Sequence, residues 1–208
     1  MTIPLSAAPE TVRGPAEHDV RTQIIEAATA HFSHYGYDKT TVSDLAKAIG
    51  FSKAYIYKFF PSKQAIGELI CANCLSQIEA DVHQALSATA APPEKLLVLF
   101  TVIVESSLRL FLQDRRLYEI AVAAATDQWP SAQAYQARIR KQVEDILKEG
   151  RASGEFETVS DLQMTSHAVY QVLAPYLNPV TLPHLKALHA EHPQALQQLV
   201  LRSLAPQR

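Results

Sequence analysis

The sequence predicts an all-α protein, and three observations support that fold class. Apolar residues recur at helical spacing from Val20 onward, whereas the strict alternation that is typical of strands never persists. Glycines and prolines interrupt this pattern at intervals of one helix length. Hydrophobic residues make up 48% of the 208 positions, which is enough for a substantial core and excludes a chain that is disordered throughout.

The N-terminal region is predicted to contain a tail and one helix. Residues 1–18 are rich in proline, alanine and serine and lack a helical period, so we interpret them as a flexible tail. The helix that follows places Ile24, Ala28 and Phe32 on one face, and it ends at Gly36.

Two short helices joined around one glycine come next. Thr41 and Asp44 resemble a capping box at the start of the first helix, which Gly50 ends. Ser52 is placed to cap the second helix, over residues 53–60. Two helices of about two turns in this arrangement form a helix-turn-helix.

The rest of the chain is predicted to be helical as well. Pro61 ends the second short helix, and Ser62 caps a long helix that ends in the linker 87–94. Further helices are expected at about 94–113, 115–127, 131–152, 160–177 and 193–204. The predicted breaks are Pro130, Gly154, Pro175, Pro179 and Pro183.

The helix at 53–60 divides into two faces. Ile56, Phe59 and Phe60 cluster on one side, and Ala54 and Lys58 lie opposite them. A DNA-recognition helix needs this division, because its buried face sets the angle at which exposed side chains enter the major groove. An ordinary helical hairpin with solvated lysines would show the same pattern.

Charge also distinguishes this segment. The chain carries a formal net charge of -2, so any DNA binding must come from a local cluster of basic groups. Residues 39–63 contain one acid, Asp44, and five lysines: Lys39, Lys47, Lys53, Lys58 and Lys63. The local balance is 5 − 1 = +4.

The segment KTTVSDLAKAIGFSKAYIYKFFPSKQAIGELI resembles the DNA-binding signature of the tetracycline-repressor (TetR) family, and the likeness covers residues 20 to about 70. It implies an N-terminal three-helix helix-turn-helix DNA-binding domain at 19–66 and a C-terminal helical ligand-binding and dimerisation domain at 67–208. The partner implied is double-stranded operator DNA. The residues implied to contact it are Thr40, Thr41, Ser43, Ser52, Lys53, Ala54, Tyr55, Tyr57, Lys58 and Lys63.

Two of these positions depart from the commonest family pattern. Ala54 stands where glycine is frequent, and Tyr55 stands where a small or hydroxyl residue is frequent. The base sequence that relatives read therefore cannot be transferred to this chain.

The resemblance also implies a homodimer, since the last two helices of the family form a four-helix bundle between subunits. The residues that this assigns to the interface are Leu162, Thr165, Val169, Val172, Leu173, Tyr176, Leu196, Leu199, Val200, Ser203 and Leu204. The alternative is that these apolar stripes pack only within one chain. A dimer would double the base readout on a palindromic site.

A small, mostly apolar effector is expected among the middle helices, which carry aromatic side chains with hydroxyl, indole and imidazole groups. The candidate ligand-binding residues are Phe100, Phe111, Tyr118, Trp129, Tyr135, His167 and Tyr170. Core packing is the alternative for each of them. Repression is implied by the family, and activation stays open.

Other kinds of chemistry find little support in the sequence. Nucleophile-elbow, phosphate-loop and metalloprotease motifs are absent, so we expect no enzyme, no cofactor and no metal site. No signal peptide or membrane span is predicted, and two cysteines cannot form a disulfide scaffold, which indicates a cytoplasmic protein. Two alternatives remain: a thiol-based redox regulator that uses Cys71 and Cys74, and a helical ligand-binding dimer without DNA function.

Overall fold

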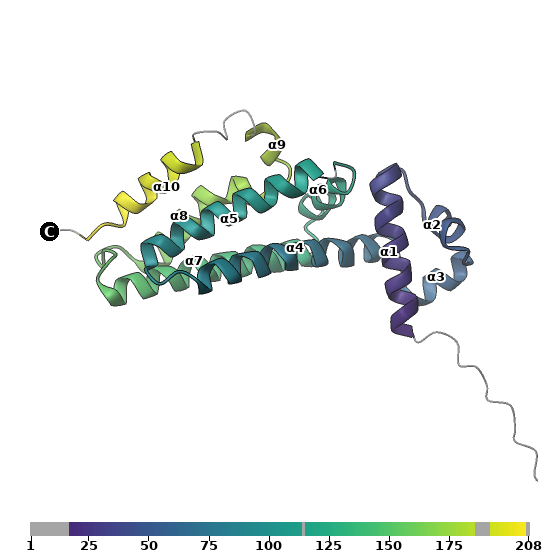
Figure 1. The fold of residues 1–208 in the computed structure, drawn as a ribbon, viewed down its shortest axis with the longest axis horizontal. Coiled ribbons are helices and arrows are strands. Elements are labelled where there is room, and N and C mark those ends of the chain that lie inside the picture. The colour runs from purple at the N-terminus through teal and green to yellow at the C-terminus, as the bar shows by residue number, and fades with distance from the viewer. Residues whose placement is uncertain (1–16, 114, 186–191, 207–208) are drawn as a thin grey trace, which may run out of the picture.

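A computed structural model describes residues 17–113, 115–185 and 192–206, and every regular element in these ranges is a helix (Figure 1). The helices are α1 (Glu17–Tyr35), α2 (Val42–Ile49), α3 (Lys53–Phe59), α4 (Lys63–Ser87), α5 (Pro92–Gln113), α6 (Tyr118–Thr126), α7 (Pro130–Ser153), α8 (Leu162–Leu177), α9 (Leu182–Leu185) and α10 (His192–Ser203). The all-α fold class is confirmed.

The boundaries differ from the sequence expectation at a few places. Helix α1 begins at Glu17, inside the predicted tail, whose residues 1–16 lie outside the described part of the chain. The short helix α9 was not predicted. The predicted break at Pro175 is wrong, because this proline lies inside α8. It removes only the amide that would pair with the carbonyl of Gln171, and that residue is exposed, so water can satisfy the carbonyl.

Helix α4 joins the two parts of the molecule. Figure 1 shows α1, α2 and α3 gathered at one end, with α4 running from them into a bundle with α5, α7 and α8. Its first half carries Ile66 and Ile70 into the core of the N-terminal domain, and its second half carries Ile78 and Val82 into the core of the bundle. A displacement of α4 therefore moves both cores.

Helix α5 is the central apolar helix of the bundle. By length and composition alone it could span a membrane, which the sequence reading had missed. In the structure it packs against α4, α7, α8 and α10, and Leu99, Phe100 and Ile103 are almost fully buried. Packing within the chain accounts for part of its hydropathy, since 39% of its apolar stretch is buried.

The core of the N-terminal domain extends beyond the predicted domain boundary at residue 66. Ile120 and Ala124 of α6 pack into it, together with Trp129 from the turn before α7. The ring of Trp129 lies 5.8 Å from that of Tyr37, in an edge-to-face contact. The helix-turn-helix thus shares its core with elements of the C-terminal domain.

Candidate DNA-binding surface and ligand pocket

The helix-turn-helix is built by local hydrogen bonds. Thr41 caps α2 in a capping box: its Oγ1 accepts from the Asp44 amide at 3.2 Å, and Asp44 Oδ2 accepts from the Thr41 amide at 2.9 Å. Gly50 ends α2 with φ +80°, a left-handed conformation that favours glycine. Ser52 then caps α3, accepting from the Tyr55 amide at 3.1 Å. These caps fix the angle between the two short helices.

The recognition helix α3 has one buried face and one open face. Ile56 is fully buried in the domain core, and Phe60, directly after the helix, is 2% exposed. Ala54, Tyr57 and Lys58 are exposed. With Lys53, which is also exposed, the open face carries two ammonium groups and a phenol, groups that bind phosphates and base edges.

Three residues of the predicted DNA-contact set have roles inside the domain. Thr40 is 2% exposed, and its hydroxyl donates to the Gly36 carbonyl at 2.7 Å, so it is not available to DNA. Tyr55 is half-buried, with its ring 5.0 Å from that of Phe51 and 5.3 Å from that of Phe59. Tyr55 serves mainly to anchor α3, because its ring packs against these two phenylalanines.

Lys63 is the third. Its Nζ donates to the Tyr37 carbonyl at 2.9 Å and to the Asp38 carbonyl at 3.4 Å, and it lies 4.3 Å from the centre of the Tyr37 ring. The ammonium therefore holds the turn between α1 and α2 against the start of α4. The remaining predicted residues, Thr41, Ser43, Ser52, Lys53, Ala54, Tyr57 and Lys58, are exposed or half-buried on the surface of the helix-turn-helix.

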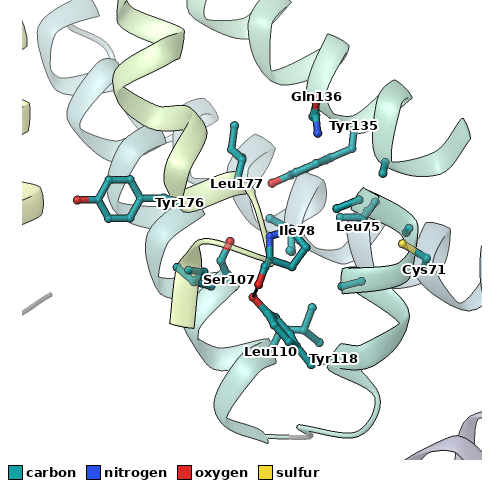
Figure 2. Close-up of a pocket in the computed structure, with 16 residues that line it drawn as sticks. Cys71, Leu75, Ile78, Ser107, Leu110, Tyr118, Tyr135, Gln136, Tyr176 and Leu177 are labelled. Carbon is teal, nitrogen blue, oxygen red and sulfur yellow. Dashed lines mark hydrogen bonds between the residues drawn. The ribbon is translucent and has the colours of Figure 1, made fainter. Parts of the chain in front are cut away.

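A pocket lies among α4, α5, α6, α7, α8 and α9 (Figure 2), and the space in it that is open to the centre of a water molecule is about 50 Å³. Its walls are mostly apolar side chains, with three tyrosines, Ser107 and Gln136 as the polar members, and no charged residue lines it. The lining residues are Cys71, Leu75, Ile78, Ser107, Leu110, Tyr118, Ala121, Ala124, Ala125, Ala132, Tyr135, Gln136, Tyr176, Leu177, Pro179 and Leu182.

Two of the seven predicted ligand-binding residues, Tyr118 and Tyr135, line this pocket. Tyr118 donates its hydroxyl to the Pro179 carbonyl at 3.0 Å, the bond drawn in Figure 2. The Tyr135 hydroxyl is buried and has no hydrogen-bond partner. Burial raises the pKa of both phenols, so both are neutral.

The other five predicted residues do not line the pocket. Phe100 and Tyr170 belong to the core of the bundle, and Phe111 packs its ring 5.0 Å from that of Tyr118. Trp129 belongs to the core of the N-terminal domain, and His167 is exposed on α8. Aromatic type alone did not separate the residues of the pocket wall from those of the core.

Helix α6 connects this pocket with the helix-turn-helix. Tyr118 lines the pocket, and the next residue, Glu119, accepts a hydrogen bond from the Tyr37 amide at 3.0 Å. Gly36 makes this approach possible: it has φ +88°, and a Cβ there would lie 2.8 Å from Glu119 Oε2. Sequence reasoning missed Glu119, although it is the single charged residue of an otherwise apolar helix.

The two thiols of α4 are poorly placed for redox sensing. Burial raises the pKa of the Cys71 thiol to about 11, and it also raises the pKa of Cys74. With these raised pKa values, both thiols are protonated at neutral pH. Since the thiolate is the reactive form, both are expected to react slowly. In the described part of the chain, no group of three or more His, Cys, Asp or Glu residues is placed to hold a metal ion.

Five residues of the predicted dimer interface are covered within the chain. Val169, Leu173, Tyr176, Val200 and Leu204 are at most 6% exposed, so within one chain they already belong to its core. The physical reason is that α8 and α10 already bury one apolar stripe against α5 and α7. Of the remaining six, Leu162, Thr165, Val172 and Leu196 are half-buried, and Leu199 and Ser203 are exposed.

Comparison with known proteins gives two family matches. The description "Bacterial regulatory proteins, tetR family" matches residues 24–68, and "Tetracyclin repressor-like, C-terminal domain" matches residues 92–200. Together they span both the helix-turn-helix and the bundle.

Individual relatives agree with these matches. The HTH-type transcriptional repressor KstR2 of Mycolicibacterium smegmatis is 28% identical over 159 residues, which are 76% of each chain. The regulator PfmR of Thermus thermophilus has a structure with a TM-score of 0.56, at 26% identity over 90% of this chain and 97% of that one. FadR of Bacillus subtilis, solved in complex with stearoyl-CoA, has a TM-score of 0.63 at 19% identity, covering 88% and 98% of the two chains.

Proposed function

Because the chain belongs to the TetR family of bacterial regulatory proteins, we propose that it is a homodimeric repressor that binds a two-fold symmetric operator and is released by a small, mostly apolar effector. The open face of α3 supports DNA binding. Lys53, Tyr57 and Lys58 project from a helix whose opposite face is anchored, which is the arrangement that enters a major groove. The chain's relative KstR2 is a transcriptional repressor, which supports repression rather than activation.

The surface of α8 and α10 supports a homodimer. Helix α8 contains no Asp, Glu, Lys or Arg among its 16 residues. Its Met164 side chain is 74% exposed. Leu199 on α10 is 64% exposed. An uncharged helix surface with exposed apolar side chains is typical of an interface, and a symmetric pair of α3 helices would read two half-sites.

The observation that carries the effector response is the adjacency of Tyr118 and Glu119 on the first turn of α6. One lines the pocket, and the other holds the amide of Tyr37, in the turn that leads into α2. A ligand that shifts α6 to enter the pocket acts on the helix-turn-helix through this hydrogen bond. If the ligand and the DNA favour different positions of α6, each lowers the affinity of the protein for the other.

The proposal is tested by selection from a library of random DNA duplexes with the purified full-length protein. We expect enrichment of a palindrome whose half-sites are about one helical turn apart or a multiple of it. Recovery of no common sequence, from protein that is folded and dimeric in light scattering, would favour a helical ligand-binding dimer without DNA function.

A further inference from the structure

The Tyr135 hydroxyl is the one buried polar group of the pocket wall that is orphaned among the described side chains. Tyr135 is 4% exposed, and no acceptor or donor contacts its hydroxyl oxygen. Figure 2 shows its ring extending from α7 across the pocket toward the side of Leu177. The neighbouring Tyr118 hydroxyl differs, since it is already paired with the Pro179 carbonyl. A buried hydroxyl without a partner is costly and calls for an explanation at its site.

The electrostatics of the wall limit the charge of any occupant. None of the lining residues is charged, so a carboxylate or an ammonium group in the pocket would lose its hydration without gaining a counter-charge. Beyond the wall, the negative charge of Glu79 raises the pKa of Tyr135, and Glu79 forms an ion pair with Arg138 at 2.5 Å. In the adjacent hollow, Arg140 lies 4.7 Å from the centre of the Tyr170 ring, where the aromatic face engages its guanidinium.

The shape of the wall limits the size of the occupant. A smaller hollow with an apolar lining lies beside the pocket and shares Cys71, Leu75, Leu110 and Ala121 with it. Both spaces border Ala121 of α6, and the pocket also borders Ala124 and Ala125, whose short side chains leave room beside them. A compact apolar body fits this space better than a large or extensively polar one.

We propose that this pocket selects an uncharged, compact apolar molecule that carries one oxygen acceptor, such as a ketone, and that the Tyr135 hydroxyl donates a hydrogen bond to that oxygen. The inference rests on the proposed function, since it names the effector class of the same pocket. Tyr135 is the specificity-determining residue, and the alanine wall supplies the apolar contact.

Three probes of nearly equal shape test the proposal on the free protein: acetophenone, cumene and benzoate. They differ in bearing a neutral oxygen acceptor, no acceptor and a negative charge, respectively. Dissociation constants are measured by ligand-observed NMR titration with wild type, Tyr135→Phe and Tyr118→Phe. We expect Tyr135→Phe to weaken acetophenone about fivefold, or about 1 kcal/mol, and to leave cumene unchanged. Benzoate should not bind at concentrations that saturate with acetophenone.

The controls separate the hydrogen bond from the cavity. Tyr118→Phe removes a hydroxyl that is already paired, so its effects on acetophenone and cumene should be equal. Ala121→Leu fills the apolar wall and should abolish binding of both probes. Without ligand, Tyr135→Phe should leave the free energy of unfolding unchanged or raise it, because it removes an unpaired buried hydroxyl.

Several results would overturn the proposal: no acetophenone binding up to its solubility, benzoate binding as tightly as acetophenone, or equal responses of acetophenone and cumene to Tyr135→Phe. A loss of stability in Tyr135→Phe as large as that in Tyr118→Phe would do the same. These measurements contain no DNA. A failure here alongside a palindrome from the duplex selection would remove the ligand class and leave the regulator assignment intact.

Discussion

Replacing Glu119 by alanine should weaken operator binding without disturbing the DNA-contacting surface itself. The carboxylate accepts from the Tyr37 amide at 3.0 Å, and Tyr37 is only 5% exposed, so the variant leaves that amide without its partner. A hydrogen bond to a charged group contributes about 1.5–3 kcal/mol. Because Glu119 is half-buried, solvent screening reduces this to about 1–2 kcal/mol of unfolding free energy. Operator affinity falls only by the part of this that differs between the free and the DNA-bound protein, so about 30-fold is the upper limit of the loss.

Glu68→Ala provides the matched control. Glu68 accepts from the Ser131 amide at 2.7 Å and from the Ser131 hydroxyl at 3.1 Å, a comparable pair of bonds that joins α4 to α7 and does not contact the helix-turn-helix. Both variants should lower the free energy of unfolding in urea, measured by circular dichroism. Only Glu119→Ala should lower operator affinity in fluorescence anisotropy at fixed salt, and it should speed hydrogen exchange of the turn at residues 36–41.

The reasoning would be refuted if Glu119→Ala destabilised the protein yet bound the operator as tightly as wild type. The hydrogen bond would then be part of the fold only. A loss of operator affinity in Glu68→Ala as large as that in Glu119→Ala would also contradict it, because any weakening of the core would then suffice.

Three further predictions concern the DNA surface, the dimer and the thiols. Lys58→Ala should cost about 1–3 kcal/mol of operator affinity in anisotropy titrations, with no change in stability. Lys63→Ala should also lower the unfolding free energy by about 1 kcal/mol, because its amine holds the Tyr37 turn. Equal thermal stability of the two variants would contradict this. Leu199→Asp should yield monomers in light scattering, whereas Leu112→Asp, at a similarly exposed apolar site, should stay dimeric; a dimeric Leu199→Asp would place the interface elsewhere. With a pKa of about 11, Cys71 has roughly 100-fold less thiolate near pH 8 than a thiol with the ordinary pKa of 9.0. Its alkylation, followed by mass spectrometry, should therefore be slow and should speed up as the pH approaches 11. Fast alkylation of the folded protein at neutral pH would revive the redox alternative.

Much of the N-terminal domain could be predicted from the sequence, because its signals are local. The capping box of Thr41 and Asp44, the left-handed Gly50 and the cap at Ser52 each depend on residues within one turn of helix. The two faces of α3 follow from helical periodicity alone, and Ile56 and Lys58 lie where that periodicity puts them.

The pocket and the interface could not be predicted to the same extent, because they depend on contacts between distant segments. Val200 and Leu199 are adjacent apolar residues, yet one is 6% exposed in the core and the other 64% exposed. Trp129 appeared suited to a ligand but fills the space above Gly67, where a Cβ would lie 3.0 Å from its ring. Glu119 is 82 residues from its partner Tyr37, and no periodicity indicates that pairing.

The most direct test of the account compares the affinity of the full-length protein for its selected operator with its affinity for a scrambled duplex of equal length and composition. At physiological salt, a sequence-reading dimer should bind the operator at least about 1,000-fold more tightly. The double variant Ala54→Glu/Lys58→Glu alters only the open face of α3, since both positions are exposed. In this variant the preference for the operator should disappear, while the fold and the dimer persist. Equal affinity of the wild type for both duplexes would contradict the central claim that α3 reads DNA.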